Sequence, residues 1–268
     1  MLSMMLNVEN ISADYGKRRV INKLSFSANE GQLVVIVGRN GCGKTTLLKS
    51  IIGDVPITDG IINFCNDKRE DNLVLMTRRK RAQYISMVEQ QLPQATMLVE
   101  DYIALGRLPY QSLFSVKKSW KDIEKVQQVI DKVGINYFAN REMQKLSGGE
   151  KQLCAIARML VQDTPIILLD EPISSLDILH QITIVSVIKQ LRDEGKIVIC
   201  VIHDLNIAFA LADVIGVMKA GAFLAFGKPT DNAVREALDS AMDTEMNFFS
   251  INNGQNTIIA PRKWNEIF

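Results

Sequence analysis

The sequence predicts an α/β fold in which helices cover a largely parallel sheet. Three apolar runs rich in β-branched residues indicate buried strands, at residues 32–37, 166–169 and 196–202. A helical pattern follows the first run at residues 46–52, and another at residues 179–192 separates the second run from the third. Buried strands that alternate with helices are typical of a parallel sheet, because the connecting helices cover its faces.

The remaining elements flank or interrupt this alternation. Residues 4–37 are strand-rich, which predicts an N-terminal antiparallel β region, and further short strands are expected at 61–64 and 82–88. Helical periods at 99–105 and 119–133 predict a helical stretch between about residues 92 and 160. The last forty residues contain one predicted helix, at 233–238, and no recognisable chemistry.

Composition narrows the classes of protein. The 268 residues are 47% hydrophobic and 23% charged, with a net charge of +1, so nothing global points to nucleic acid. The basic clusters at 17–19 and 78–81 are expected to be solvated faces or edges. No apolar run reaches about 18 residues, and the start lacks a basic segment, so neither a membrane span nor a secretory signal is expected. Four scattered cysteines predict reduced thiols in a cytosolic compartment.

A glycine-rich loop joins the first buried strand to its helix. Glycines let the backbone approach a phosphate closely, and the helix N-terminus directs N–H groups at it. A lysine and a hydroxyl at the end of the loop suit the β- and γ-phosphates and Mg²⁺. The loop is Gly38, Arg39, Asn40, Gly41, Cys42, Gly43, Lys44 and Thr45. It predicts a nucleoside triphosphate site, in which the helix N-terminus and Lys44 are expected to lower the pKa of Cys42.

Three further motifs extend this site. Asp170 and Glu171 follow a buried strand, at the edge where parallel sheets bind ligands; the alternative is two solvated carboxylates that cap a loop. Asp170 is expected to hold Mg²⁺ through water, and Glu171 to act as general base on the attacking water. Residues 147–150, Ser-Gly-Gly-Glu, open a helix and offer a second anion site. His203 follows the strand at 196–202.

Together these motifs resemble the ATP-binding subunit of an ABC transporter, over nearly the whole chain. The resemblance implies a P-loop NTPase core of the ABC type, with a parallel-rich sheet, an N-terminal antiparallel region and an inserted helical subdomain. The core would comprise residues 1–91 and 161–226. The helical subdomain would span about 92–160, and a C-terminal extension would span 227–268.

The resemblance also implies a role for each motif residue. Tyr15 would stack on adenine, residues 38–46, including Thr46, would form the phosphate loop, and Gln90 would sense Mg²⁺ and touch the membrane partner. The signature would be Ser147, Gly148, Gly149 and Glu150. Asp170 would belong to the Mg²⁺ site, with Thr45 and Gln90, and Asp177 to the loop that crosses to the other subunit. Glu171 would be the catalytic base and His203 the switch residue on the γ-phosphate, and both would act with Gln90 and Lys44 in catalysis.

Two positions depart from the family pattern. Glu89 replaces the usual proline before the sensing glutamine and Gln91 follows it, so either glutamine could hold that role, with Gln90 favoured by alignment to the preceding strand. Ile173 replaces a frequent threonine, a change expected to be tolerated.

The resemblance implies partners as well. Two chains would close on two Mg-ATP, and polytopic permease subunits would anchor them at the cytoplasmic face of the inner membrane, with a substrate-binding protein acting indirectly and no nucleic acid. The segment Gly106–Tyr110 resembles ATPases that serve importers of iron-siderophore, haem or vitamin B12, although a helix-ending glycine followed by proline would explain it too. The alternatives are another ABC branch, a soluble ABC ATPase acting on ribosomes or nucleic acid, and a phosphoryl-transfer enzyme.

Overall fold

A six-stranded sheet forms the centre of the protein. The computed structural model describes residues 4–67, 69–92, 95–111, 119–251 and 256–263. The strand order is β10-β9-β3-β8-β7-β6, and all neighbours are parallel except β10 with β9. The strands are β3 (Leu33–Val37), β6 (Ile85–Val88), β7 (Ile166–Asp170), β8 (Ile197–Val201), β9 (Val214–Lys219) and β10 (Ala222–Gly227). This confirms the predicted parallel-rich sheet.

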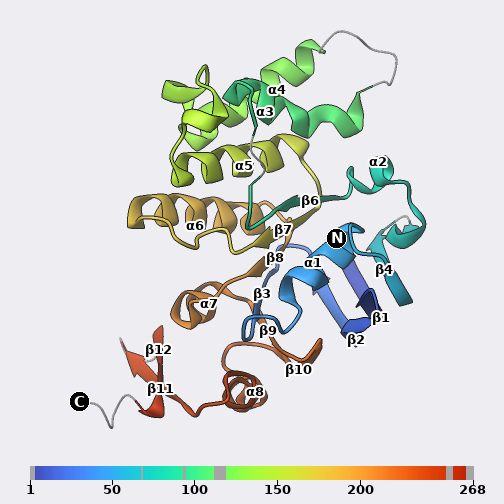
Figure 1. The fold of residues 1–268 in the computed structure, drawn as a ribbon, viewed down its shortest axis with the longest axis vertical. Coiled ribbons are helices and arrows are strands. Elements are labelled where there is room, and N and C mark those ends of the chain that lie inside the picture. The colour runs from blue at the N-terminus through green and yellow to red at the C-terminus, as the bar shows by residue number, and fades with distance from the viewer. Residues whose placement is uncertain (1–3, 68, 93–94, 112–118, 252–255, 264–268) are drawn as a thin grey trace.

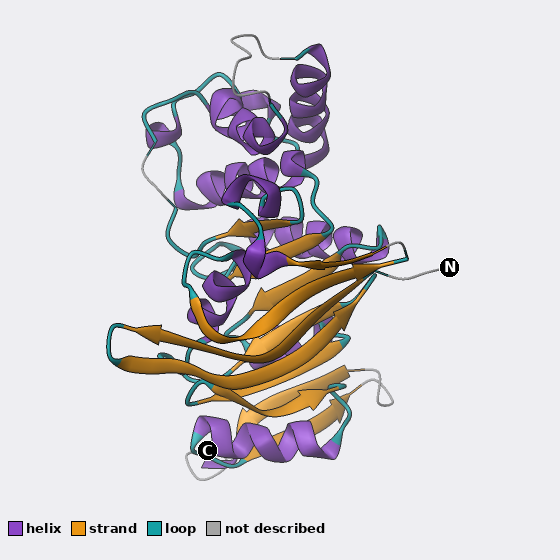
Figure 2. Cartoon of the chain, turned by 90° about the vertical axis from the view of Figure 1, so that its right-hand side faces the viewer, coloured by secondary structure: helices purple, strands orange, loops and turns teal. Residues whose placement is uncertain are grey.

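A second, antiparallel sheet packs beside the first. Its order is β2-β1-β4-β5, and its long strands face the viewer in Figure 2. Helix α1 (Lys44–Ile52) packs with it against the central sheet. The strands are β1 (Met5–Tyr15), β2 (Arg18–Asn29), β4 (Ile57–Asn66) and β5 (Arg69–Asn72). The predicted antiparallel N-terminal region is thus confirmed.

Every central strand except β10 is buried on both faces, which explains its continuous apolar sequence. In β3, Val34 and Ile36 belong to the cluster shared with the antiparallel sheet, and Val35 and Val37 belong to the cluster shared with the helices. The period of two therefore divides the hydrophobic core into two layers, one on each face of the central sheet. The strand predicted at 82–88 is wrong over its first three residues, because Ala82–Tyr84 form the turn that follows α2 (Arg78–Arg81).

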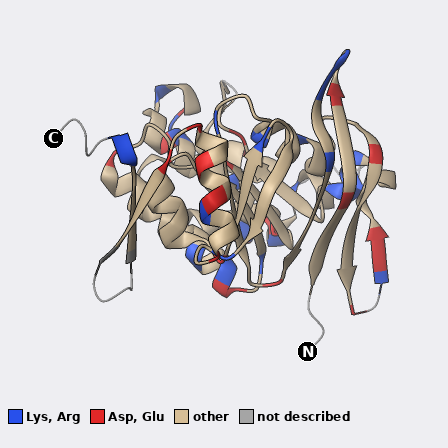
Figure 3. Cartoon of the chain, turned by 90° about the horizontal axis from the view of Figure 1, so that it is seen from below, with Lys and Arg blue, Asp and Glu red and all other residues tan. Residues whose placement is uncertain are grey.

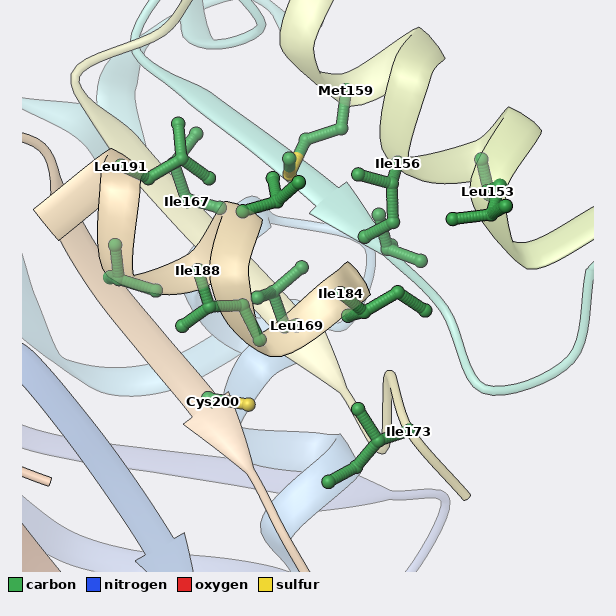
Figure 4. Packing of buried hydrophobic residues seen from close by; sticks show 14 of the residues in the cluster. Leu153, Ile156, Met159, Ile167, Leu169, Ile173, Ile184, Ile188, Leu191 and Cys200 are labelled. Carbon is green, nitrogen blue, oxygen red and sulfur yellow. The ribbon is translucent and has the colours of Figure 1, made fainter. Parts of the chain in front are cut away.

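Helices cover the other face of the sheet and extend beyond its end (Figure 1). Helices α3 (Val99–Ala104), α4 (Trp120–Val133) and α5 (Gly148–Gln162) lie between β6 and β7 in the chain. Helix α6 (Ile178–Asp193) joins β7 to β8. Figure 4 shows aliphatic side chains of α5 and α6 meeting those of β7, among them Ile156, Ile167 and Ile188. This layer fixes the start of α5 and the start of α6 relative to the end of β7.

Gly106 does not end a helix, contrary to one interpretation of its sequence. It lies inside the 3-10 helix Leu105–Tyr110, which continues α3 and contains Pro109. A Cβ at Gly106 would lie 2.3 Å from the carbonyl oxygen of Arg158 in α5. Glycine is needed there because the two helices approach too closely for a side chain.

The basic cluster at 78–81 is only partly the solvated edge that the sequence predicted. Arg78 is exposed and pairs with Asp54 at 3.2 Å, as expected for a surface group. Arg81, in contrast, donates to the carbonyl oxygens of Ile52, Val74 and Met76 at 3.0–3.3 Å. Its guanidinium therefore links the end of α1 to the 3-10 turn (Leu73–Leu75) that follows β5. Basic and acidic residues are interspersed over the elements seen in Figure 3.

The C-terminal part of the chain packs against α7 (Leu205–Leu211). Helix α8 (Asn232–Met242) leads into the hairpin β11 (Met246–Ile251) and β12 (Asn256–Pro261). The Asn206 side chain accepts from the Ile259 N–H at 2.7 Å and donates to its carbonyl oxygen at 3.4 Å. The ring of Phe209 lies 5.8 Å from that of Phe248. Within the described residues, no helix has both the length and the apolar character needed to cross a membrane.

Candidate nucleotide site

The loop between β3 and α1 has a backbone that requires glycine. Gly38, Gly41 and Gly43 have φ values of 151°, 78° and 114°, a region that side-chain-bearing residues rarely adopt. A Cβ at Gly38 would lie 2.3 Å from the carbonyl oxygen of Met218 in β9. The turn thus passes tightly over the sheet edge and leaves the N-terminus of α1 open to an anion.

Lys44 lies inside the curve of this loop. It is only 6% exposed, and its Nζ donates to the carbonyl oxygens of Gly38 at 2.7 Å and Arg39 at 3.1 Å. An open pocket of about 420 Å³ lies over the loop. It is lined by Val20, Asn40, Gly41, Gly43, Lys44, Thr45, Thr46, Gln90, Glu171 and His203. Four other parts of the chain therefore surround the phosphate-binding loop and contribute Val20, Gln90, Glu171 and His203.

Asp170 ends β7 and is buried beneath this pocket. It is 1% exposed, and the Thr45 hydroxyl donates a hydrogen bond to its carboxylate. Its Oδ1 accepts no hydrogen bond from the described residues. Burial raises the pKa of this carboxyl, and this effect is larger than the lowering of the pKa by the hydrogen bond from Thr45. A buried carboxylate oxygen without a donor is an electrostatically unsatisfied group that a hard cation would stabilise.

Glu171 is held by two side chains from neighbouring loops. Its Oε2 accepts from Gln90 Nε2 at 2.8 Å, and its Oε1 lies 2.5 Å from His203 Nε2. The Glu171 backbone has φ 52°, an uncommon value for a residue with a side chain, and its N–H donates to Val201 O at 3.1 Å. Such backbone strain is often found at functional sites.

The geometry favours Gln90 over Gln91 as the residue at this site. Gln90 follows β6, the edge strand that pairs with β7 in parallel, so the ends of the two strands lie together. Its side-chain amide reaches Glu171, whereas Gln91 is exposed and does not line the pocket. The sequence alone left this choice open.

The Ser147–Glu150 segment begins α5 with a capping box. The Ser147 N–H donates to Glu150 Oε2 at 2.8 Å, and the Glu150 N–H donates to Ser147 Oγ at 3.3 Å. The hydrogen bond from the Ser147 backbone is the main cause that lowers the pKa of Glu150. The amides of Gly148 and Gly149 lie at this N-terminus, where the helix dipole favours an anion.

The predicted residues fall into separate groups in space. Among the described residues, the lining of the phosphate pocket includes neither the Ser147–Glu150 segment nor Asp177. Asp177 caps α6 and accepts from the N–H groups of Leu179 and His180, each at 3.0 Å. Tyr15 ends β1 opposite Arg18, is 53% exposed and does not line this pocket either. One chain thus carries a phosphate pocket and, apart from it, a second helix N-terminus with free glycine amides.

The expected lowering of the Cys42 pKa is wrong. Burial raises the pKa of this thiol and outweighs the opposite influence of the nearby Lys44 ammonium. A Cβ built on Gly38 would lie 2.9 Å from Cys42 Sγ, so the thiol occupies the inside of the loop. Packing, rather than activation, accounts for its position.

An ionic link that the sequence does not predict joins the loop to the end of α8. Arg39 Nη1 pairs with Asp243 Oδ2, and Lys219 Nζ pairs with Asp243 Oδ1 at 2.8 Å. The two bonds lower the pKa of Asp243, with the hydrogen bond from Lys219 as the larger cause. The pattern of the sequence gives no signal for this link, because residues 39 and 243 are 204 positions apart.

Comparison with known proteins agrees with this geometry. The family model described as ABC transporter matches residues 21–174. The petrobactin import ATP-binding protein FpuD of Bacillus anthracis is 34% identical over 84% of this chain and 82% of its own length. The hemin import ATP-binding protein HmuV of Pseudoalteromonas translucida is 32% identical over 85% of this chain and 88% of its own.

A solved structure extends the likeness to three dimensions. An inward-facing putative metal-chelate type ABC transporter contains a chain that superposes with a TM-score of 0.81, at 27% identity, over 96% of this chain and 97% of that one. The fold and the pocket define a nucleotide-binding P-loop ATPase. More specifically, the chain belongs to the ABC transporter family, among its ATP-binding subunits.

Proposed function

We propose that this chain powers an ABC importer for a metal chelate, of the iron-siderophore, haem or cobalamin type. The observation that carries the catalytic part is the placement of Glu171 at the phosphate pocket by Gln90 and His203. The importer part rests on similarity to import ATP-binding proteins for petrobactin and hemin, and to the metal-chelate transporter.

In this proposal the phosphate loop binds the β- and γ-phosphates of ATP. The Lys44 ammonium exchanges its bonds to the two loop carbonyls for phosphate oxygens, and the N–H groups at the start of α1, including those of Thr45 and Thr46, supply further donors. Tyr15 is assigned to the adenine ring; it is exposed at the β1–β2 turn, and Val20 of the same hairpin lines the pocket.

The oxygen groups around Asp170 fit Mg²⁺. The Thr45 hydroxyl, the Gln90 amide oxygen and the buried Asp170 carboxylate are the kinds of ligand that this ion prefers, directly or through water. When bound, Mg²⁺ would neutralise charge on the phosphates. The residues themselves orient the nucleotide, and the charge of the ion would favour the ionised form of Asp170, whose pKa burial raises.

Glu171 is assigned as the general base. It takes a proton from water as the water oxygen bonds to the γ-phosphorus and the bond to the bridging oxygen of ADP breaks, which yields ADP and phosphate. His203, 2.5 Å from the carboxylate, is placed to orient Glu171 and to stabilise charge on the γ-phosphate. Gln90 holds the other oxygen and links the site to the helices that follow β6.

Two chains are assigned to one functional unit. The Ser147–Glu150 helix start is a second anion site that does not line the pocket of its own chain, so it completes the site on a second copy. The Ser174–Asp177 loop would cross to that copy. Permease subunits would bind this dimer at the cytoplasmic face of the inner membrane, receive substrate from a binding protein, and follow its closure and reopening.

The test is to identify what binds this chain in its native membrane. Tagged Glu171→Gln protein is purified in Mg-ATP, with untagged cells processed in parallel as the control. A polytopic permease of the metal-chelate type that copurifies in stoichiometric amount is the expected result. Ribosomal or nucleic-acid proteins without a membrane partner would instead place the ATPase in the soluble branch and overturn the importer proposal.

A further inference from the structure

The imidazole of His180 connects two segments that are separate in the sequence, the Asp177 loop and the start of α5. His180 lies in the first turn of α6, and its ring Nδ1 is 2.6 Å from Asp177 Oδ2. The other carboxylate oxygen, Oδ1, accepts from the Leu179 and His180 N–H groups. Asp177 is therefore fixed both by the backbone of α6 and by this ring.

The same ring lies against the start of α5. A Cβ built on Gly149 would lie 2.9 Å from both Cγ and Nδ1 of His180, and 3.0 Å from Cε1. Three ring atoms at nearly equal distance mean that the ring face covers the backbone of Gly149. Glycine at this position therefore has a packing role as well as an electrostatic one, because a side chain would displace the ring.

The loop before His180 is braced from the same helix. Gln181 Nε2 donates to Ile173 O at 3.3 Å and to Leu176 O at 3.1 Å, and Ser174 Oγ donates to Glu171 O at 3.1 Å. The backbone carbonyls of the segment from Glu171 to Asp177 are thus fixed by hydrogen bonds from Ser174 within the segment and from Gln181 of α6. The contact of His180 with Gly149 joins this braced loop to the signature.

We propose that His180 is a positioning residue that locks the Asp177 loop and the Ser147–Glu150 helix start into one unit. The inference rests on the proposed two-chain function, in which both segments face the nucleotide of the partner. In such a unit the amides of Gly148 and Gly149 and the Asp177 loop have a fixed relative position before two chains meet. Less conformational entropy is therefore lost when the dimer closes. Nucleotide binding by a single chain depends on Lys44 and does not involve the unit.

The test compares His180→Ala with the unchanged residue, both in full-length Glu171→Gln protein that accumulates the closed dimer. The ATP concentration that gives half-maximal dimer in light scattering is expected to rise roughly tenfold, which is about 1.4 kcal/mol for each of the two bound ATP molecules. The affinity of the monomer for a fluorescent ATP analogue is expected to stay unchanged. Thr183→Ala is the matched control, because its hydroxyl bonds Leu179 O within the same helix.

A double-mutant cycle separates positioning from a general loss of structure. Gly149→Ala should impair dimer formation strongly when the ring is present and less when His180 is already alanine, because the displaced ring is then missing. Additive effects of the two changes, or normal dimer formation by His180→Ala, would overturn the inference. If the parent protein with His180 intact forms no dimer in Mg-ATP, even with its permease, the two-chain function itself fails instead.

Discussion

The carboxylate of Glu171 lies 2.5 Å from Nε2 of His203, although the two residues come from different loops of the sheet edge. Glu171 follows β7 and His203 follows β8, and these strands are parallel neighbours in the sheet. Gln90, after β6, reaches the same carboxylate from the other side. The ends of the adjacent strands β6, β7 and β8 therefore bring three polar side chains into contact at the phosphate loop.

Cys42 offers a test of the environment of the phosphate loop. Because burial raises its thiol pKa, alkylation by a maleimide should be slow at pH 7 and accelerate toward pH 9, as the thiolate forms. Modification should abolish ATP hydrolysis, because the sulfur lies inside the loop, and bound ATP should protect. The measurement is residual phosphate release against time of treatment, where an unchanged sensitivity of Cys42→Ala would transfer the effect to another cysteine.

Gly106→Ala tests the close approach of the 3-10 helix to α5. The new Cβ would lie 2.3 Å from Arg158 O, so one helix has to shift, and overpacking of this kind costs roughly 1–3 kcal/mol. Urea unfolding should show a lower midpoint for the variant. Gly148→Ala is the control for stability, since a Cβ there meets nothing within 4 Å. Equal midpoints for both variants would contradict the packing described here.

Asp163 predicts a pH-dependent contribution to stability. Partial burial alone would raise the pKa of this carboxyl, but hydrogen bonds from Lys125 and Lys196, at 2.6 and 2.9 Å, lower it to about 2. A depressed pKa means that the stabilisation is complete above the unfolded value of about 4 and is lost as pH falls from there toward 2.

The variant Asp163→Asn measures this contribution. It should lower the free energy of unfolding by about 1 kcal/mol at pH 7, since half-exposed ion pairs contribute roughly 0.2–1 kcal/mol each. Urea titrations at pH 7, 5 and 3.5 should show the difference from the parent protein shrinking at the lowest pH. Asp193→Asn, whose carboxylate bonds the adjacent Arg192, serves as the control. A difference that is constant over this range would contradict the ionic origin.

Asn206→Ala tests the attachment of the C-terminal hairpin. The change removes both hydrogen bonds to the Ile259 backbone, so β11 and β12 should open more often and be cleaved several-fold faster by a protease. Ala210→Ser, at an exposed position of the same helix, should leave the rate unchanged. Equal cleavage rates of all three proteins would mean that other contacts hold the hairpin.

Much of the fold follows from local patterns in the sequence. The strands around residues 166–169 and 196–202 and the helix between them were predicted because a buried parallel strand is continuously apolar. The phosphate loop was predicted because its glycines satisfy a backbone requirement that only glycine meets. The helix from Trp120 to Val133 was predicted through its apolar period and the glycine at 134, which has φ 75°.

The relationships that escaped prediction are non-local. The residues next to Gly106 in the sequence predict a helix end there. Only the position of α5 in the structure shows why a glycine is needed. Asp243 and Ile259 lie in a segment without any recognisable motif. They nevertheless bind Arg39, in the phosphate loop, and Asn206, three residues after His203. His180 follows Asp177 at the spacing of one helical turn, a signal that could have suggested their contact but not the stacking on Gly149.

In the proposed function, Glu171 is the general base of a site that a second chain completes. The most direct measurement combines light scattering and phosphate release for Glu171→Gln in saturating Mg-ATP, with the permease present. We expect a stable dimer and hydrolysis reduced roughly 10²- to 10⁴-fold, the usual contribution of general base catalysis. A protein that stays monomeric, or that hydrolyses ATP at the rate of the parent, would contradict the account.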